Sequence, residues 1–240
     1  MEILYISLLA VFASAVGTFT GFGTSTIMVP VLLFYLPLPQ TLLLVGIIHW
    51  FGDIWKILFF KKGFNWKLIL TFGIAGMVAS YLGASIIFSI SEKLISQILG
   101  GFLIAYVLFL FLKPKFKIPN GTLNALSGGV LSGFFAGIFG VGGAIRGVFL
   151  SAFDLPKAVY ISTAGAIALF IDSTRIITYL LNNVILEWQF FWGFLLFIPA
   201  SFIGAWLAKK LVDRIPQNKF RIVIAIFLFL IGIKFLLFSS

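Results

Sequence analysis

Several ionisable residues interrupt long apolar stretches of this chain. His49, Asp53 and Lys56 are spaced by four and three positions, which places them on one face of a helix. Asp172 and Arg175 repeat the Asp-x-x-basic spacing. An ionised group within a bilayer costs about 2.5–3.5 kcal/mol on insertion scales, so it faces a partner or a water-filled path. The two pairs could carry coupling charge during transport, or they could only fix helix packing. His49 could handle protons.

Two glycine motifs suggest a binding site. "GFGTSTIMVP" (21–30) and "GVGGAIRGVF" (140–149) break apolar runs with glycine and follow it with polar or charged residues. Glycine allows a sharp turn and a close approach to the backbone, and a helix that starts after the break points free N–H groups into the gap. The motifs therefore predict a small-oxyanion site, built from Gly21, Phe22, Gly23, Thr24, Ser25, Gly142, Gly143 and Arg146.

Arg146 is the most specific of these predictions. It lies one helical turn after Gly142, and Ile27 stands at the matching place in the first motif. A guanidinium stays ionised and can donate two parallel hydrogen bonds to an oxyanion. We expect an anionic substrate or a carboxylate, that of Asp53 or Asp172, to neutralise it. The evenly spaced Gly129, Gly133 and Gly137 instead indicate close helix packing.

Composition identifies the class of protein. The chain is 61% hydrophobic and 10% charged, with a mean hydropathy of +1.17, and apolar runs long enough to cross a bilayer recur along it. These values predict an all-α integral membrane protein. The net charge of +10 comes largely from short loops, where it orients the protein in the membrane, so we expect no nucleic-acid partner.

Enzymatic chemistry has little support. There is no cysteine and one histidine, which excludes disulfides, thiol catalysis and multi-histidine metal sites. No Ser–His–Asp order or carboxylate cluster is apparent. We therefore expect no enzyme activity, no metal and no cofactor, and the expected partners are a small anion and the lipid bilayer.

The apolar runs predict eight elements in a single membrane domain spanning 1–240. The N-terminus lacks the positive region of a signal peptide, so the first element is expected to remain in the mature protein. The elements cover 3–36 and 122–150, each interrupted by a glycine motif, and 38–60, 68–90, 94–112, 156–181, 188–208 and 219–238.

An internal repeat is expected. At one constant offset the first glycine motif aligns with the second, Asp53 with Asp172, and Lys56 with Arg175. Common order at constant offset is typical of duplicated transporter halves. The halves are about 1–115 and about 120–240.

The loop charges predict how the halves sit. If every element crossed the membrane, basic loops would lie on both sides, against the positive-inside rule. If the two broken elements instead enter and return as re-entrant hairpins, all basic loops fall on one side. Each half then has a hairpin and three transmembrane helices, the halves are inverted, and both termini lie outside the cell.

The sequence resembles the TauE/SafE family of membrane proteins, named for sulfite export. The resemblance rests on "GTFTGFGTSTIMVPVLLF" (17–34) and "SGFFAGIFGVGGAIRGVFL" (132–150), and it covers essentially the whole chain. The family's usual Gly-x-Gly-Gly-Gly is replaced here by Gly-Phe-Gly-Thr-Ser and Gly-Val-Gly-Gly-Ala. The resemblance implies export or exchange of sulfite, sulfoacetate or related organosulfur anions across the cytoplasmic membrane.

Two functions are consistent with these features. One is a secondary transporter that moves a small sulfur-containing oxyanion by alternating access between the two halves. The other is an anion channel, or an importer of another small anion, that uses the same hairpin tips.

Overall fold

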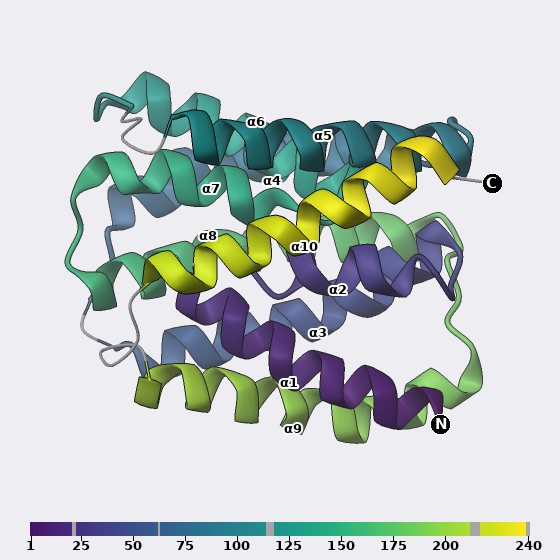
Figure 1. The fold of residues 1–240 in the computed structure, drawn as a ribbon. Coiled ribbons are helices and arrows are strands. Elements are labelled where there is room, and N and C mark those ends of the chain that lie inside the picture. The colour runs from purple at the N-terminus through teal and green to yellow at the C-terminus, as the bar shows by residue number, and fades with distance from the viewer. Residues whose placement is uncertain (21–22, 62, 114–117, 212–216, 239–240) are drawn as a thin grey trace.

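Helix dominates the described part of the chain (Figure 1). The computed structural model describes residues 1–20, 23–61, 63–113, 118–211 and 217–238. Within these ranges it holds ten α-helices, one 3-10 helix and no strand. The elements are α1 (Glu2–Thr20), α2 (Ser25–Leu32), α3 (Leu38–Phe59), α4 (Trp66–Ile86), α5 (Glu92–Leu112), α6 (Thr122–Phe139), α7 (Gly142–Leu150), η1 (Ser151–Phe153), α8 (Lys157–Leu181), α9 (Trp188–Leu211) and α10 (Gln217–Phe238).

Six of these helices are long and apolar enough to cross a membrane, namely α3, α4, α5, α6, α8 and α9. Their outward surfaces carry large exposed hydrophobic side chains, such as Trp192, Leu195 and Leu196 on α9. Such a surface is stable in lipid, where helices satisfy their own backbone hydrogen bonds. The prediction of an all-α integral membrane protein is confirmed.

Local sequence explains where several helices begin. α3 starts after Pro37 and has a proline in its first turn, where a missing N–H costs nothing. The side chains of Asn65 and Ser91 cap α4 and α5 by accepting hydrogen bonds from Leu68 N (3.0 Å) and Leu94 N (3.4 Å). These caps fix the short connections between the spanning helices.

The first and fifth predicted elements are each divided at the glycine motif. In the first, α1 ends at Thr20 and α2 begins at Ser25. In the fifth, α6 ends at Gly140, whose φ of 71° is in the left-handed region, and α7 begins at Gly142. Glycine adopts this conformation without the steric cost that a side chain would add.

The chain reverses at both breaks. In the first hairpin Ser14 Oγ and Thr24 Oγ1 are 3.3 Å apart, and the Tyr5 and Tyr35 rings beyond them are 5.9 Å apart. α2 therefore runs back along α1. In the second, Ser132 Oγ donates to Gly142 O (2.9 Å), and Phe149 lies against Gly128. α7 therefore runs back along α6.

The two hairpins start from opposite ends of the helix bundle (Figure 1). The outer end of the first lies near the start of α3, where Leu38 N donates to Glu92 Oε2 (3.4 Å). The outer end of the second lies near the start of α4, where Phe153 and Asn65 line one cavity with Asn120. The internal repeat and the inverted halves stay predictions.

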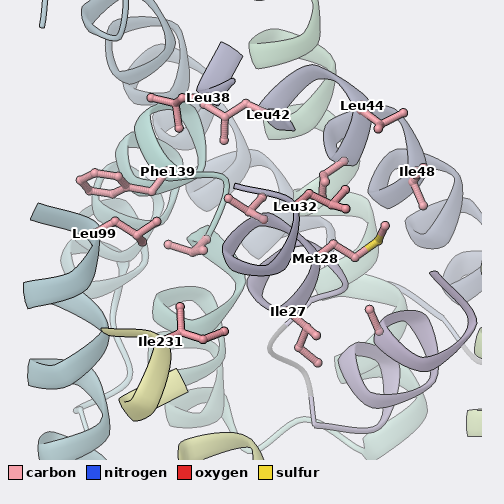
Figure 2. Packing of buried hydrophobic residues seen from close by; sticks show 14 of the residues in the cluster. Ile27, Met28, Leu32, Leu38, Leu42, Leu44, Ile48, Leu99, Phe139 and Ile231 are labelled. Carbon is pink, nitrogen blue, oxygen red and sulfur yellow. The ribbon is translucent and has the colours of Figure 1, made fainter. Parts of the chain in front are cut away.

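A buried apolar core surrounds α2, the returning arm of the first hairpin (Figure 2). Its Ile27, Met28 and Leu32 lie among side chains of α3 and Phe139 of α6. An eight-residue helix cannot span a bilayer, so burial in protein is what stabilises it at membrane depth.

The glycines predicted to act in packing do so. Gly129, Gly133 and Gly137 on α6 contact backbone atoms of Phe72, Gly76 and Ser80 on α4. A side chain at any of them would collide with that backbone, so α4 and α6 pack unusually closely.

Described charges separate between the ends of the bundle. Basic residues flank the ends of α3, α5 and α9 and the starts of α4 and α8, namely Lys61, Lys67, Lys113, Lys157, Lys209 and Lys210. Near the opposite end lie three acidic residues, Glu2, Glu92 and Glu187, and two basic ones, Lys93 and Lys234. Asp154, just before α8, is an acidic residue on the basic side. We call the two ends the basic end and the acidic end.

Candidate functional site

The two hairpin tips meet inside the bundle. Gly23 has a φ of 82°, and a Cβ placed on it would lie 3.9 Å from the Cα of Gly143. A Cβ placed on Gly140, at the second tip, would lie 2.8 Å from Val29 Cγ2 of α2 and 3.1 Å from Leu42 Cδ2 of α3. Both tips therefore depend on glycine for their backbone conformation and for their contact. Gly21 and Phe22, which were also predicted to bind the anion, lie outside the described residues.

His49 of α3 faces the first tip. A Cβ on Gly23 would lie 3.0 Å from His49 Nε2, so any side chain there would press on the imidazole. Ser25, the first residue of α2, places its Oγ 3.3 Å from His49 Nδ1. Thr24 instead contacts Ser14 of α1, and both hydroxyls are buried.

His49 also joins the two predicted charge pairs. Its Nδ1 lies 2.7 Å from Asp172 Oδ2 on α8, and its Nε2 lies 3.7 Å from Asp53 Oδ1. Lys56 Nζ donates to Asp53 Oδ1 (2.8 Å), and Arg175 Nε donates to Asp172 Oδ1 (2.7 Å). The five side chains form one buried charge chain, Lys56–Asp53–His49–Asp172–Arg175, across α3 and α8.

Part of the hydrogen-bonding capacity of this charge chain is unused. Within the described ranges no partner is found for His49 Nε2, Asp53 Oδ2, or the Nη1 and Nη2 of Arg175. Asp172 Oδ2 is close to His49 but not aligned for a hydrogen bond. A buried polar group without a partner costs about 1–3 kcal/mol. So many at one place indicate a site that a ligand, water or proton completes.

Arg175 directs its spare nitrogens at the second tip. Its side chain is 0% exposed, and a Cβ placed on Gly140 would lie 3.4 Å from Nη1. Gly46 of α3 lies on the other side of the guanidinium. A Cβ placed on Gly46 would lie 3.6 Å from the same Nη1, so the missing side chain leaves room for the guanidinium. Within the described residues Nη1 and Nη2 have no aligned hydrogen-bond partner beside the point where the hairpins meet, although the Tyr179 hydroxyl lies close to the guanidinium.

Arg146 pairs with neither of the two carboxylates that were considered for it, and its role in binding an anion stays a prediction. Arg146 is 4% exposed, and within the described residues it forms no ion pair with Asp53 or Asp172. Its guanidinium is within electrostatic range of Tyr160, near the start of α8. Tyr160 precedes Asp172 by about 18 Å along the helix at 1.5 Å per residue. Arg146 therefore lies between the tips and the basic end.

Gly142 lies inside its own hairpin. A Cβ on it would collide with Ser132 O and approach Ala136 of α6. Packing between α6 and α7 is sufficient to require glycine there, whereas Gly143 is the residue that contacts the first tip.

Geometry alone would allow a metal ion beside His49. One ligand atom each from His49, Asp53 and Asp172 lie within 4.8 Å of one another. However, Lys56 and Arg175 already neutralise the two carboxylates, so a divalent cation would meet two fixed positive charges at short range. We assign no metal to this cluster.

Two residues of the site, Ser14 and Gly46, were not predicted from the sequence. The close contact between His49 and Asp172 was not predicted either. The helical spacing did contain a signal for the contact between His49 and Asp172. His49 shares a face with Asp53, and Asp53 aligns with Asp172, so two related helix faces that meet in the centre would bring all three together.

Comparison with known proteins establishes the family. The family model described as "Sulfite exporter TauE/SafE" matches residues 6–235. The chain belongs to the TauE/SafE family. Its members are membrane transporters rather than enzymes, so the expectation of no enzyme activity is confirmed.

A curated relative agrees with the assignment to the TauE/SafE family. A protein of Methanocaldococcus jannaschii named "Probable membrane transporter protein" is 30% identical over 89 residues. The alignment covers 35% of this chain and 33% of that protein. The match therefore spans only about a third of the relative, and it adds the general class of membrane transporter.

Proposed function

We propose that this protein is a secondary transporter that exports or exchanges small sulfur-containing oxyanions, such as sulfite or organosulfonates, across the cytoplasmic membrane. The observation that carries the proposal is the meeting of two re-entrant hairpin tips beside a buried guanidinium whose Nη1 and Nη2 lack an aligned partner among the described residues. Broken helices that meet near the membrane midplane form the substrate site in many secondary transporters.

The charge at the tips suits an anion. With His49 neutral, the two carboxylates of the charge chain balance Lys56 and Arg175, and Arg146 adds one positive charge nearby. The starts of α2 and α7 add partial positive charge, because their first N–H groups lack helical partners. A planar guanidinium fork suits the oxygen atoms of a sulfite or sulfonate group.

Arg146 has a separate role in this proposal. Because it lies between the tips and the basic end, it attracts the anion on the path to the tips. Arg175 then holds the anion beside Gly140 and Gly143.

Burial of the site favours a carrier. Thr24, Ser25, His49, Arg175 and Gly143 are all buried, so the anion must be released by a rearrangement of the hairpins. A carrier alternates access in this way, whereas a channel needs a continuous path.

The orientation follows from the charged ends. The basic end lies in the cytoplasm by the positive-inside rule. The acidic end, which includes the start of α1, then faces outward, and both termini lie outside.

Counterflow in proteoliposomes tests the proposal. Vesicles loaded with unlabelled sulfite should take up ³⁵S-sulfite faster than empty vesicles. A carrier that binds unlabelled sulfite inside the vesicle returns its site to the outside faster than an empty carrier does. Equal rates would indicate a channel. A panel of sulfite, sulfoacetate, taurine, thiosulfate and sulfate then ranks the substrates, and absence of flux for every anion would refute the proposal.

A further inference from the structure

The imidazole of His49 is placed to bind a proton at the centre of the molecule. Its Nδ1 lies 2.7 Å from Asp172 Oδ2, and although the two atoms are not aligned for a hydrogen bond, the adjacent negative charge favours a proton on that nitrogen in the neutral ring. Nε2 then carries the lone pair. That nitrogen is buried and has no hydrogen-bond partner within the described ranges.

Two groups lie in front of Nε2. Asp53 Oδ1 is 3.7 Å away, and the Gly23 backbone of the first tip approaches it directly. A proton on Nε2 would create an imidazolium between two carboxylates and beside the proposed anion site. Both the Asp53 charge and a bound anion would stabilise it electrostatically.

We propose that His49 Nε2 binds one proton together with each transported anion, so that anion and proton move as a pair. The proposal rests on the transport function proposed above. A hydronium ion on the side where the anion enters gives its proton to Nε2, so that one O–H bond breaks as the Nε2–H bond forms. On the other side the Nε2–H bond breaks, the proton returns to water, and the anion leaves.

The charge count supports the pairing. The charge chain is neutral when His49 is neutral and carries one positive charge when His49 is protonated. A monovalent anion brings the total back to neutral. Because burial makes an uncompensated charge costly, the proton and the anion each favour binding of the other.

Among the described residues, the titratable groups nearest His49 belong to its own charge chain. α3 contributes Asp53, with Lys56 behind it, and α8 contributes Asp172, with Arg175 and Tyr179 behind it. α2 has no titratable residue, and the charged or phenolic residues of α1 and α9 are Glu2 and Tyr5 at one end and Lys209 and Lys210 at the other. Arg146 of α7 lies toward Tyr160.

The carboxylates are less suited to carry this proton. Each already accepts a hydrogen bond from a cationic side chain, Lys56 or Arg175, so an added proton would have to compete with that donor. A free imidazole gains and loses its proton nearer to neutral pH than a free carboxyl, ammonium or guanidinium group does. His49 is therefore the group that can load and unload a proton in each cycle.

Methanesulfonate provides a clean probe, because it stays a monovalent anion near neutral pH. In proteoliposomes with an internal pH dye, an inward methanesulfonate gradient should acidify the lumen by about one proton per anion. Flux should not change when valinomycin and potassium set different membrane potentials, since no net charge moves. Flux without acidification, or flux driven by potential, would overturn the proposal.

His49→Gln identifies the proton site. Linkage of one proton predicts that apparent methanesulfonate affinity in the parent falls about tenfold per pH unit above the range where the free site is protonated. In His49→Gln the affinity should be weaker and flat with pH. Retained proton coupling in this variant would overturn the assignment to His49.

Trp50→Phe is the matched control. Trp50 Nε1 donates to Ser173 Oγ (2.8 Å) and joins the same two helices at the neighbouring positions, but it cannot titrate. Its proton-to-anion ratio should equal that of the parent. A ratio lost equally in both variants would overturn the proposal in favour of a structural role for the α3–α8 contact.

Failure of the two proposals can be told apart. If the parent moves neither methanesulfonate nor sulfite, the transport function is refuted. If it moves sulfite only, the pH dependence of sulfite flux is compared between parent and His49→Gln, so that the protonation of sulfite itself cancels. A difference of one proton supports the proposal, and identical profiles refute it.

Discussion

The two Asp-x-x-basic pairs look equivalent in the sequence but differ in the structure. Lys56 donates its one close hydrogen bond to Asp53, and it lies toward the basic end of α3. Within the described residues Arg175 binds Asp172 through Nε alone, so both terminal nitrogens remain without an aligned partner at the second tip. The Asp53–Lys56 pair therefore mainly balances charge, whereas the Asp172–Arg175 pair presents a cation to the hairpins.

His49 increases this difference. It lies 2.7 Å from Asp172 but 3.7 Å from Asp53. Asp172 therefore supports both a proton site and an anion site, and Asp53 supports neither as directly. The predictions below break or sharpen this contrast.

Removal of the Asp172 charge should have the largest effect. Asp172→Asn leaves Arg175 buried without a counter-ion, and loss of one partner of a buried pair typically costs about 3–5 kcal/mol. We expect sulfite exchange to fall at least about a hundredfold, with a lower melting temperature. Asp53→Asn is the matched comparison and should retain about a tenth of the exchange activity, because Lys56 lies near the end of α3 and can extend toward water. It should still respond to a pH gradient, because His49 and Asp172 remain. Equal effects would show that the two pairs are equivalent.

Exchange of the basic residues separates charge from hydrogen bonding. Arg175→Lys keeps the charge but loses the two terminal donors, so sulfite affinity should fall about tenfold to a hundredfold, as expected for lost charged hydrogen bonds. Lys56→Arg should change affinity less than about threefold. Affinities come from concentration-dependent counterflow. A tight-binding Arg175→Lys variant would place the anion away from this guanidinium.

Arg146 should show a milder and graded response. If it attracts the anion on the path from the basic end, Arg146→Gln should slow loading by about tenfold while the protein remains folded. Arg146→Lys should recover most of the rate, because the charge survives. The salt dependence of the rate should decrease in Arg146→Gln. Anion binding that disappears in Arg146→Gln but persists in Arg175→Lys would reverse the roles of the two arginines.

The topology prediction involves no change in flux. A reporter at the C-terminus should be accessible from outside, and one inserted at residue 115 should be accessible only from the cytoplasm. Detection of both on the same side would contradict the inverted arrangement of the hairpins.

The sequence predicted much of this fold because the bilayer limits the alternatives. Apolar runs of spanning length become helices, and glycine beside polar residues marks the breaks. α1 ends at Thr20 and α2 begins at Ser25, and the second break is at 140–141, so the helices end where the motifs are. Helical spacing also predicted that Lys56 pairs with Asp53 and that Arg175 pairs with Asp172.

Contacts between distant segments could not be predicted in the same way. The approach of His49 to Asp172 depends on how α3 and α8 cross, and the separation of Arg146 from both carboxylates depends on how α7 returns along α6. The spacing of His49 and Asp53 and the alignment of Asp53 with Asp172 indicate which helix faces are related, but they do not fix how the helices cross. The sequence showed which residues are costly in lipid, and tertiary packing decides which of them meet.

The most direct test of the account is a crystal structure with selenite, an analogue of sulfite with an anomalous scatterer. The account predicts one selenium peak between the hairpin tips, near Gly143, with oxygen atoms at hydrogen-bond distance from Arg175 Nη1 and Nη2. A peak only at the cavity of about 250 Å³ lined by Asn65 and Lys67 at the basic end, in protein that still exchanges sulfite, would contradict it.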